Sequence, residues 1–332
     1  MAHELDMTNN RANMAYVGDK PWHGLGQELT YNAPIETWEK EAGMDWDIDV
    51  ASVEFTNFDG ETKQFKNRYA LYRSDNDEGL GIVSPNYKVV QPKQALEFFR
   101  DLISEKEYQL ETAGCLFGGR KFWALAKAGQ EFKIHGQDAI APYLLMASSC
   151  DGSSATSVHL TSVRVVCNNT LRLSIGENGA NALIRVPHSA IFDATSVKEQ
   201  LGVVEETWDN FVDNVDRLAR LKIDRDWAID VVAQELKDDW KDKNGEELVG
   251  NEKLDSSTAL KRIFQLYDGE SLGNDFRSSK GTAWGLVNAV TQYYDHESGS
   301  KNDDKSRAFE RAHLTDNASL KVKITNRFLE AA

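Results

Sequence analysis

Two cations and two aromatic rings occur together directly after a Gly118-Gly119 turn signal, as Arg120, Lys121, Phe122 and Trp123. Lys and Arg side chains can pair with backbone phosphates, and aromatic rings beside them can stack on unpaired bases. This stretch is therefore the local sequence best suited to contact single-stranded nucleic acid. The alternative is an ordinary solvated hairpin turn without a ligand.

Two further arginines, Arg164 and Arg172, lie on either side of a break in an apolar stretch at Cys167-Asn168-Asn169-Thr170. Both could contact backbone phosphate. In a chain with many acidic residues, each could instead pair with a neighbouring carboxylate, which would make its role structural.

A tight loop is indicated by Trp22, His23 and Gly24, followed by a second glycine at Gly26. Two glycines beside a Trp and a His suggest a backbone that takes positive φ or closely approaches another group, so the loop is a candidate functional element. The alternative is a core-anchoring Trp with a His that hydrogen-bonds a backbone carbonyl.

No catalytic or nucleotide-binding motif of the GxSxG, Walker, GxGxxG, HExxH or kinase type occurs in the chain. The three cysteines have no CxxC spacing, and the histidines have no metal-ligand spacing. Cys167 could act as a nucleophile only if the fold brings His159 or His23 beside it. We therefore assign no catalytic residue, cofactor or metal, and favour a binding protein over an enzyme.

The elements that would position these residues are antiparallel strands in the first half of the chain. Alternation over 46–55, the hairpin signal Asp59-Gly60 and strands at 68–73 and 80–83 predict a meander. Pro92 then opens an amphipathic helix at its favoured first position. A second antiparallel run is predicted at 108–117, 121–126, 141–149 and from Ser157 onward.

The second half of the chain is predicted to be mainly helical. Apolar residues spaced 3, 4, 3, 4 and 3 apart form a heptad seam that packs on the sheet or pairs with another chain: Leu201, Val204, Trp208, Phe211, Val215 and Leu218. Asp224 and Ser256 or Ser257 are candidate helix caps. Small residues at Gly281, Ala283, Gly285 and Ala289 would let a helix approach another element closely.

These patterns predict an α+β fold with antiparallel sheets and packed helices in the N-terminal half and a mainly helical C-terminal half. The expected organisation is a flexible N-terminus at 1–20, a core at 21–197 and a helical region at 198–332. Polar loops are expected near 237–255 and 296–306.

The net charge of the chain limits the kinds of partner that it can bind. The chain of 332 residues has a net charge of −15, which argues against general affinity for polyanions. Residues 100–175, with 8 Lys and Arg against 7 Asp and Glu, form a near-neutral segment. The absence of an 18-residue apolar run and of a signal-peptide pattern predicts a protein of the host cell cytoplasm without a membrane partner.

Four stretches along the chain resemble the phage/plasmid-like protein family that carries domain of unknown function 932: Pro21–Gly26, Tyr87–Gln91, Val163–Leu171 and Gly281–His296. Members of that family occur on phages, prophages and plasmids. The resemblance therefore implies a mobile-element protein and specifies no reaction.

The order of a meander, a helix, a second antiparallel run and a further helix is similar to the β-β-β-α core of the single-strand annealing proteins of phage recombination. This analogy predicts a homo-oligomer that binds single-stranded DNA through Arg120, Lys121, Arg164 and Arg172, with Phe122 and Trp123 near the bases. The alternative is a protein-binding module whose acidic surface meets a host defence or replication factor. A third possibility is an enzyme with a site near His23 and Cys167.

Overall fold

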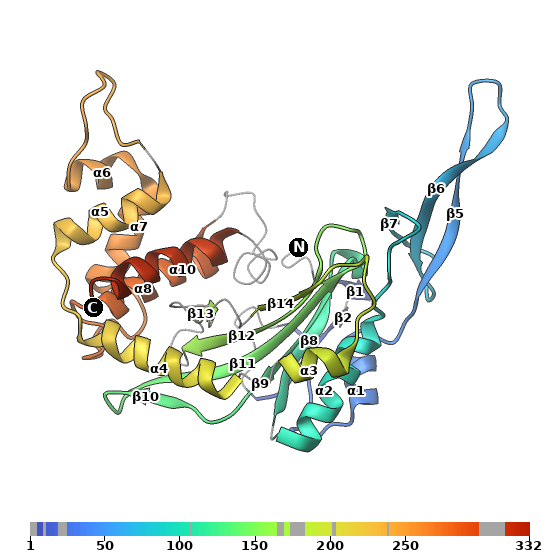
Figure 1. Ribbon diagram of the computed structural model, residues 1–332, viewed down its shortest axis with the longest axis horizontal. Helices are drawn as coiled ribbons and strands as arrows, with labels where there is room; N and C mark the ends of the chain where they lie inside the picture. Colours follow the sequence, from blue (N-terminus) through green and yellow to red (C-terminus); the bar gives the residue numbers. More distant parts are fainter. Residues whose placement is uncertain are drawn as a thin grey trace.

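A large sheet forms the centre of the computed structural model (Figure 1), which describes residues 5–8, 11–18, 25–106, 108–164, 169–172, 183–200, 204–237, 239–298 and 316–332. Within these residues the sheet has nine strands in the order β13-β12-β11-β9-β8-β3-β4, with β10 paired to β11 and β14 to β12. All of its pairs are antiparallel except β3 with β4.

The strands of this sheet have the following bounds: β3 (Met14–Tyr16), β4 (Gln27–Glu28), β8 (Gln109–Leu116), β9 (Lys121–Lys127), β10 (Phe132–Ile134), β11 (Asp138–Ser149), β12 (Thr156–Arg164), β13 (Asn169–Arg172) and β14 (Leu183–Val186). Strand β11 lies between β9 and β12 and is buried along nearly its whole length. Its continuous apolar run is therefore typical of a strand that is covered on both faces.

Short strands near the start of the described chain belong to this fold. A small pair, β1 (Met7–Thr8) with β2 (Arg11–Ala12), precedes β3, and β3 pairs with β8. Met14, Ala15 and Tyr16 are buried. Three apolar side chains among the polar ones are enough to fill an edge of the sheet, so residues 11–16 take part in the fold, while flexibility over 1–20 stays a prediction.

Helices α1 (Ile35–Glu41), α2 (Pro92–Lys106) and α3 (Ala194–Gln200) accompany the sheet half of the molecule, and a 3₁₀ turn (Phe117–Gly119) joins β8 to β9. Pro92 does open α2, as its sequence position predicts. Leu96, Phe99 and Leu102 are fully buried, so this face of α2 belongs to the core beside β8 and β9.

The C-terminal half forms a helical lobe, which lies at the opposite end of the molecule from the segment 48–83 (Figure 1). Its helices are α4 (Val204–Arg220), α5 (Arg225–Leu236), α6 (Asn251–Ser256), α7 (Thr258–Gln265), α8 (Ala283–Gln292) and α10 (Asp316–Leu329), with π-helical turns at Leu266–Glu270 and Tyr293–Glu297. The described structure therefore confirms the α+β class and the division into an antiparallel sheet half and a helical half.

The heptad seam of α4 packs inside its own chain. Phe211, Val215 and Leu218 are at most 1% exposed and belong to the main core, and α4 contacts α8, α10 and β10. Of the two predicted uses of this seam, packing within the chain is the one observed. These three side chains are not available as an oligomer interface.

A separate three-stranded sheet, β5-β6-β7, extends away from the rest of the molecule as an arm (Figure 1). Its strands are β5 (Ile48–Thr56), β6 (Thr62–Arg73) and β7 (Gly79–Val83). The pair β5-β6 continues beyond the end of β7, which pairs only with residues 69–72 of β6. Together with α2, the three strands make the predicted β-β-β-α order.

Arg73 anchors the base of the arm. Its side chain is buried, forms ion pairs with Asp6 and Asp75, and lies 4.3 Å over the ring of Trp46. Its Nη1 also donates to the Gly118 carbonyl at 3.3 Å. The arm base is thereby tied to the turn between β8 and β9.

The ion pair between Arg73 and Asp75 predicts that the protein loses stability in acid. Hydrogen bonds from Arg73 lower the pKa of Asp75, so the carboxylate stabilises the fold above its ordinary pKa of about 3.9 and this contribution is lost as the pH falls through the lower folded value. We expect the free energy of unfolding, measured with urea over a pH series below about 4, to fall less steeply in Asp75→Asn than in the wild type. Asp49→Asn, at an exposed carboxylate of β5, should keep the wild-type slope. Equal slopes in all three proteins would contradict the assignment.

Candidate functional site

The outer part of the arm exposes an irregular segment of β6. Ser52 pairs with Tyr69 and Glu54 pairs with Gln64, so Val53 alone faces residues 65–68 of β6. Asn67 within this bulge has a positive φ of 61°. Bulges re-aim side chains, and this one presents Phe65, Lys66, Asn67 and Arg68 to solvent.

Strand β6 is unusually basic for this chain. Its twelve residues include Lys63, Lys66, Arg68 and Arg73 and no Asp or Glu, whereas the whole chain carries a charge of −15. Lys63 pairs with Glu61 at 3.0 Å, and Arg73 is buried at the base. Lys66 and Arg68 have no ion-pair partner among the described residues, so two cations on the bulge are available to a ligand.

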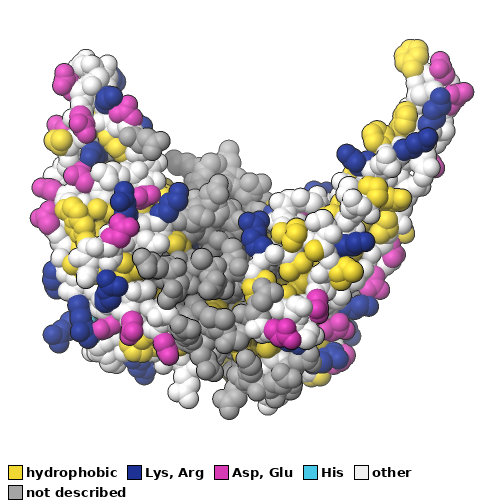
Figure 2. Space-filling view, viewed as in Figure 1, with side chains coloured by type: hydrophobic (Ala, Val, Ile, Leu, Met, Phe, Trp, Pro, Cys, Tyr) yellow, Lys and Arg dark blue, Asp and Glu magenta, His cyan; other side chains and the backbone are white. Residues whose placement is uncertain are grey.

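Aromatic side chains accompany these cations along the arm. Phe55 and Phe65 contact each other edge to face, with ring centroids 6.0 Å apart, and both are about half exposed. Tyr69 is exposed on the same strand, and Phe58 near the turn is fully exposed. Figure 2 shows hydrophobic and basic side chains interspersed along the arm. The arm therefore combines exposed cations with exposed aromatic rings. This is the composition that the sequence predicts for a contact with single-stranded nucleic acid, but it lies on the arm and not at 120–123.

The tetrad at 120–123 is only partly accessible. Arg120 is exposed and Lys121 is half-buried over the ring of Phe117. Phe122 and Trp123 are 1% and 3% exposed, and Trp123 Nε1 donates to Thr112 Oγ1 at 3.3 Å. The two rings lie in a strand covered on both faces, so neither can stack on a base in this structure, and base stacking by Phe122 and Trp123 is not supported.

The other predicted residues are placed only in part. Arg164 and Arg172 lie at the ends of β12 and β13, where Arg164 pairs with Asn169 and Arg172 with Thr161, and their side chains lie outside the described part of the structure. Trp22, His23 and Gly24 lie outside the described residues altogether, as does Cys167.

The two described cysteines are buried and unsuited to nucleophilic chemistry. Burial raises the pKa of Cys115, and raises the pKa of Cys150 to about 12, so both thiols stay protonated near neutral pH. Among the residues that the structure describes, no three His, Cys, Asp or Glu side chains are grouped to hold a metal ion. None of the helices in the described ranges has the length and apolar character that crossing a bilayer requires.

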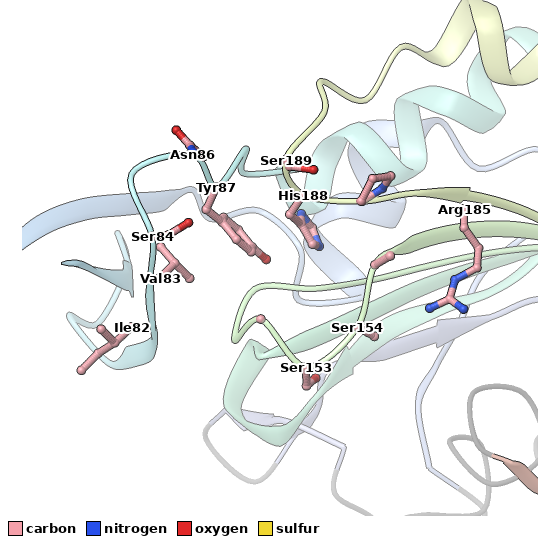
Figure 3. Close-up of a pocket in the computed structure, with 13 residues that line it drawn as sticks. Ile82, Val83, Ser84, Asn86, Tyr87, Ser153, Ser154, Arg185, His188 and Ser189 are labelled. Atoms are coloured by element: carbon pink, nitrogen blue, oxygen red, sulfur yellow. The ribbon is translucent and has the colours of Figure 1, made fainter. Parts of the chain in front are cut away.

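A cavity of about 490 Å³ lies at the base of the arm. Three segments that are far apart in the sequence form its walls: 82–87 at the end of β7 and beyond it, the β11–β12 turn at 152–155, and 185–189 at the end of β14 and beyond it (Figure 3). It is within the size range of small-molecule sites. Its lining combines apolar side chains with hydroxyls, one imidazole and one guanidinium, and contains no carboxylate among the residues described there.

Tyr87 and His188 join two of these walls. Their rings are stacked, with centroids 4.3 Å apart and planes inclined by 15° (Figure 3). The Tyr87 hydroxyl donates to the Ser149 carbonyl at 2.8 Å, and His188 Nδ1 lies 3.0 Å from the Lys88 carbonyl oxygen. Burial above all, and the negative charge of Asp151 in addition, raises the pKa of Tyr87, so the phenol remains a donor.

The third wall is a turn with its own internal hydrogen bonds. Ser153 N donates to Asp151 Oδ1 at 2.8 Å, and Ser154 N donates to Ser149 Oγ at 3.0 Å. Gly81 of β7 packs directly on this turn, because a Cβ there would lie 2.7 Å from the Asp151 Cα. This close contact fixes the β11–β12 turn against β7 at the base of the arm.

Sequence reasoning missed Arg185, His188 and Ser153 because they come from segments with no motif of their own. Tyr87 did stand in one of the stretches that carry the family resemblance. The bulge at 65–68 was also missed, although the absence of acidic residues over 62–73 was a signal available in the sequence.

The family model described as "Domain of unknown function (DUF932)" matches residues 79–315. Every residue that lines the cavity lies inside the matched segment, whereas β5 and β6 precede it. No curated protein and no solved structure matches the chain.

Proposed function

The chain belongs to the DUF932 family, whose description assigns no activity, and from its surface we propose that it binds single-stranded DNA along the β5-β6 arm, as an annealing protein would. The observation that carries this proposal is strand β6, which exposes cations and aromatic rings without a single carboxylate in a strongly acidic chain. The phage and plasmid setting implied by the family resemblance agrees with a role in recombination.

Two physical contributions support binding at this surface. Lys66 and Arg68 supply positive charge that forms no ion pair with a carboxylate in the described residues, and each phosphate contact releases counterions from the DNA strand. Phe55, Phe65 and Tyr69 are exposed rings on which bases can stack without sequence preference. The acidity of the remaining surface would repel DNA elsewhere and confine it to the arm.

The test is the salt dependence of binding to a fluorescein-labelled oligodeoxythymidylate. Lys66→Gln/Arg68→Gln is expected to weaken binding and to make the slope of log K against log salt concentration shallower by about 1.4, at about 0.7 per lost phosphate contact. Phe65→Ser is expected to weaken binding by about 1–3 kcal/mol with an unchanged slope. Annealing of complementary quenched strands should slow in the same variants.

A charge-matched control lies on the helical lobe. Arg220 and Lys241 are exposed there and pair only with surface carboxylates in the described structure, so Arg220→Gln/Lys241→Gln changes net charge equally without touching the arm. It should bind the oligonucleotide like the wild type. Equal weakening in both double variants, or no weakening in either, would reject the arm as the binding surface.

The tip of the arm favours a second candidate, a protein-binding module. Phe58 is fully exposed, and the outer edge of β5 is unpaired in the described structure, so a partner protein could add a strand there. The oligonucleotide experiment separates the candidates: a wild-type protein that retains no DNA at low salt excludes the first and leaves the second.

A further inference from the structure

We infer that the cavity at the base of the arm binds a phosphate ester, with Arg185 as its principal charged contact. This site is separate from the bulge on β6 and draws on different residues. A free nucleotide would bind it whether or not the arm binds DNA. Binding of a strand end in it would rest on the proposed function.

Charge in the cavity favours an anion. Arg185 lies on β14 at the cavity wall (Figure 3), and no carboxylate among the described residues pairs with it. The lining includes no Asp or Glu, although the chain holds 53 acidic residues against 38 basic ones. A guanidinium can hold phosphate oxygens by two parallel hydrogen bonds, which gives it geometric as well as electrostatic preference for this group.

Hydroxyl groups are further polar groups of the cavity, and they lie on both sides of the Tyr87–His188 pair: Ser84 lies across that pair from Arg185 (Figure 3). The side-chain hydroxyls of Ser84, Ser153, Ser154 and Ser189 line it and make no hydrogen bond to another described residue. Neutral donors of this kind add to a cation at phosphate sites because each phosphate oxygen accepts more than one hydrogen bond. The apolar lining by Ile82, Val83, Ala155 and Pro187 is suited to the carbon face of a sugar.

The walls are held in place without a ligand. Tyr87 is tied to Ser149, and His188 is stacked on Tyr87 and bonded to the Lys88 backbone. The turn opposite them is braced by Asp151 and Ser149. Such preorganisation lowers the entropy cost of binding, so a single guanidinium with several hydroxyls can give measurable affinity.

Asp151 is a negative charge directly before the cavity-lining segment 152–155. Its Oδ1 accepts the Ser153 amide within the turn, and it stands beside the cavity without lining it. Asparagine would keep this hydrogen bond and remove the charge. Asp151→Asn is therefore expected to tighten phosphate binding by about twofold to fivefold, a change opposite in sign to that of an Arg185 variant.

The experiment compares dTMP, inorganic phosphate and oligodeoxythymidylates with and without a 5′-phosphate by calorimetry on the full chain. Arg185→Gln is expected to weaken binding of the phosphate form that occupies the cavity by about tenfold to a hundredfold. Arg277→Gln, at an exposed arginine of the helical lobe, is the matched control and should bind like the wild type. Both variants should unfold at the wild-type temperature because both arginines are exposed.

The outcomes distinguish the source of the ligand and separate this site from the arm. Arg185-dependent binding of dTMP or inorganic phosphate identifies a free phosphate compound as the ligand. An Arg185-dependent gain that occurs only with the 5′-phosphorylated strand identifies a strand end. If both oligonucleotides bind equally, and Arg185→Gln changes neither them nor dTMP, the cavity proposal is rejected while DNA binding by the arm stands.

Discussion

Replacing Gly285 with alanine is expected to lower the free energy of unfolding by roughly 2 kcal/mol or more. Gly285 lies in α8, where a Cβ would be 2.0 Å from the Ser279 carbonyl oxygen and 2.8 Å from its carbonyl carbon. Alanine is the better helix former by about 1 kcal/mol, but overpacking in a core costs about 1–3 kcal/mol and sometimes more. The obstacle here is backbone, so no side-chain rotation relieves it.

The Ser279 carbonyl cannot easily move away. It accepts a hydrogen bond from Thr282 Oγ1 at 3.0 Å, and the same oxygen atom of Thr282 accepts from Gly285 N at 3.1 Å to cap α8. Urea unfolding followed by circular dichroism measures the effect. The control is Gly79→Ala, because Gly79 has no atom within 4 Å of its would-be Cβ and no positive φ. A Gly285→Ala protein as stable as the control would show that the close approach does not exist.

Removing the ammonium of Lys321 is the second change with a large expected effect. Lys321 Nζ lies 2.6 Å from Asp295 Oδ1, and the two side chains are 1% and 2% exposed. The pair joins α10 to the π-helical turn after α8. Lys321→Met removes this cation from a buried carboxylate, so we expect a loss of about 3–5 kcal/mol in chemical unfolding.

A double variant tests whether the loss comes from an uncompensated charge. Lys321→Met/Asp295→Leu replaces both charges with apolar groups, and buried pairs replaced in this way are often neutral or stabilising, so most of the stability should return. The exposed pair Lys261–Asp255 supplies the control, because Lys261→Met should cost less than about 1 kcal/mol. A double variant no more stable than Lys321→Met would mean that packing, and not charge, is what Lys321 provides.

Local chemistry predicted the element ends well. Asp224 caps α5 by accepting from the amides of Asp226 and Trp227, and Ser257 caps α7 by accepting from Leu260 N. Asp59-Gly60 forms the predicted hairpin turn, with Gly60 at a φ of 82°. These features depend on a few adjacent residues, which is why the sequence alone is enough to identify them.

Which side chains are exposed to solvent could not be predicted from adjacent residues in the same way. The pattern at 120–123 resembles a surface hairpin, but β9 lies inside the nine-stranded sheet of the described structure, so its aromatic rings are covered. Conversely, the predicted meander gave no indication that its first two strands extend beyond the third. Which strand lies at the centre of a sheet and which stands free depends on pairing between distant segments, as do the three walls of the cavity.

The arm also has a mechanical consequence. Within the described part of the chain, the arm packs against other elements only at its base, where Arg73 binds Asp6, Asp75 and Gly118, while 49–56 and 62–69 are almost entirely exposed. Nine residues of β5 correspond to a length of about 30 Å, so a rotation of roughly 10° at the base would carry Phe58 through about 5 Å. Because the base of the arm lies beside the cavity, a partner that pulls on the tip of the arm would act on the Arg73 contacts and on the walls of the cavity together.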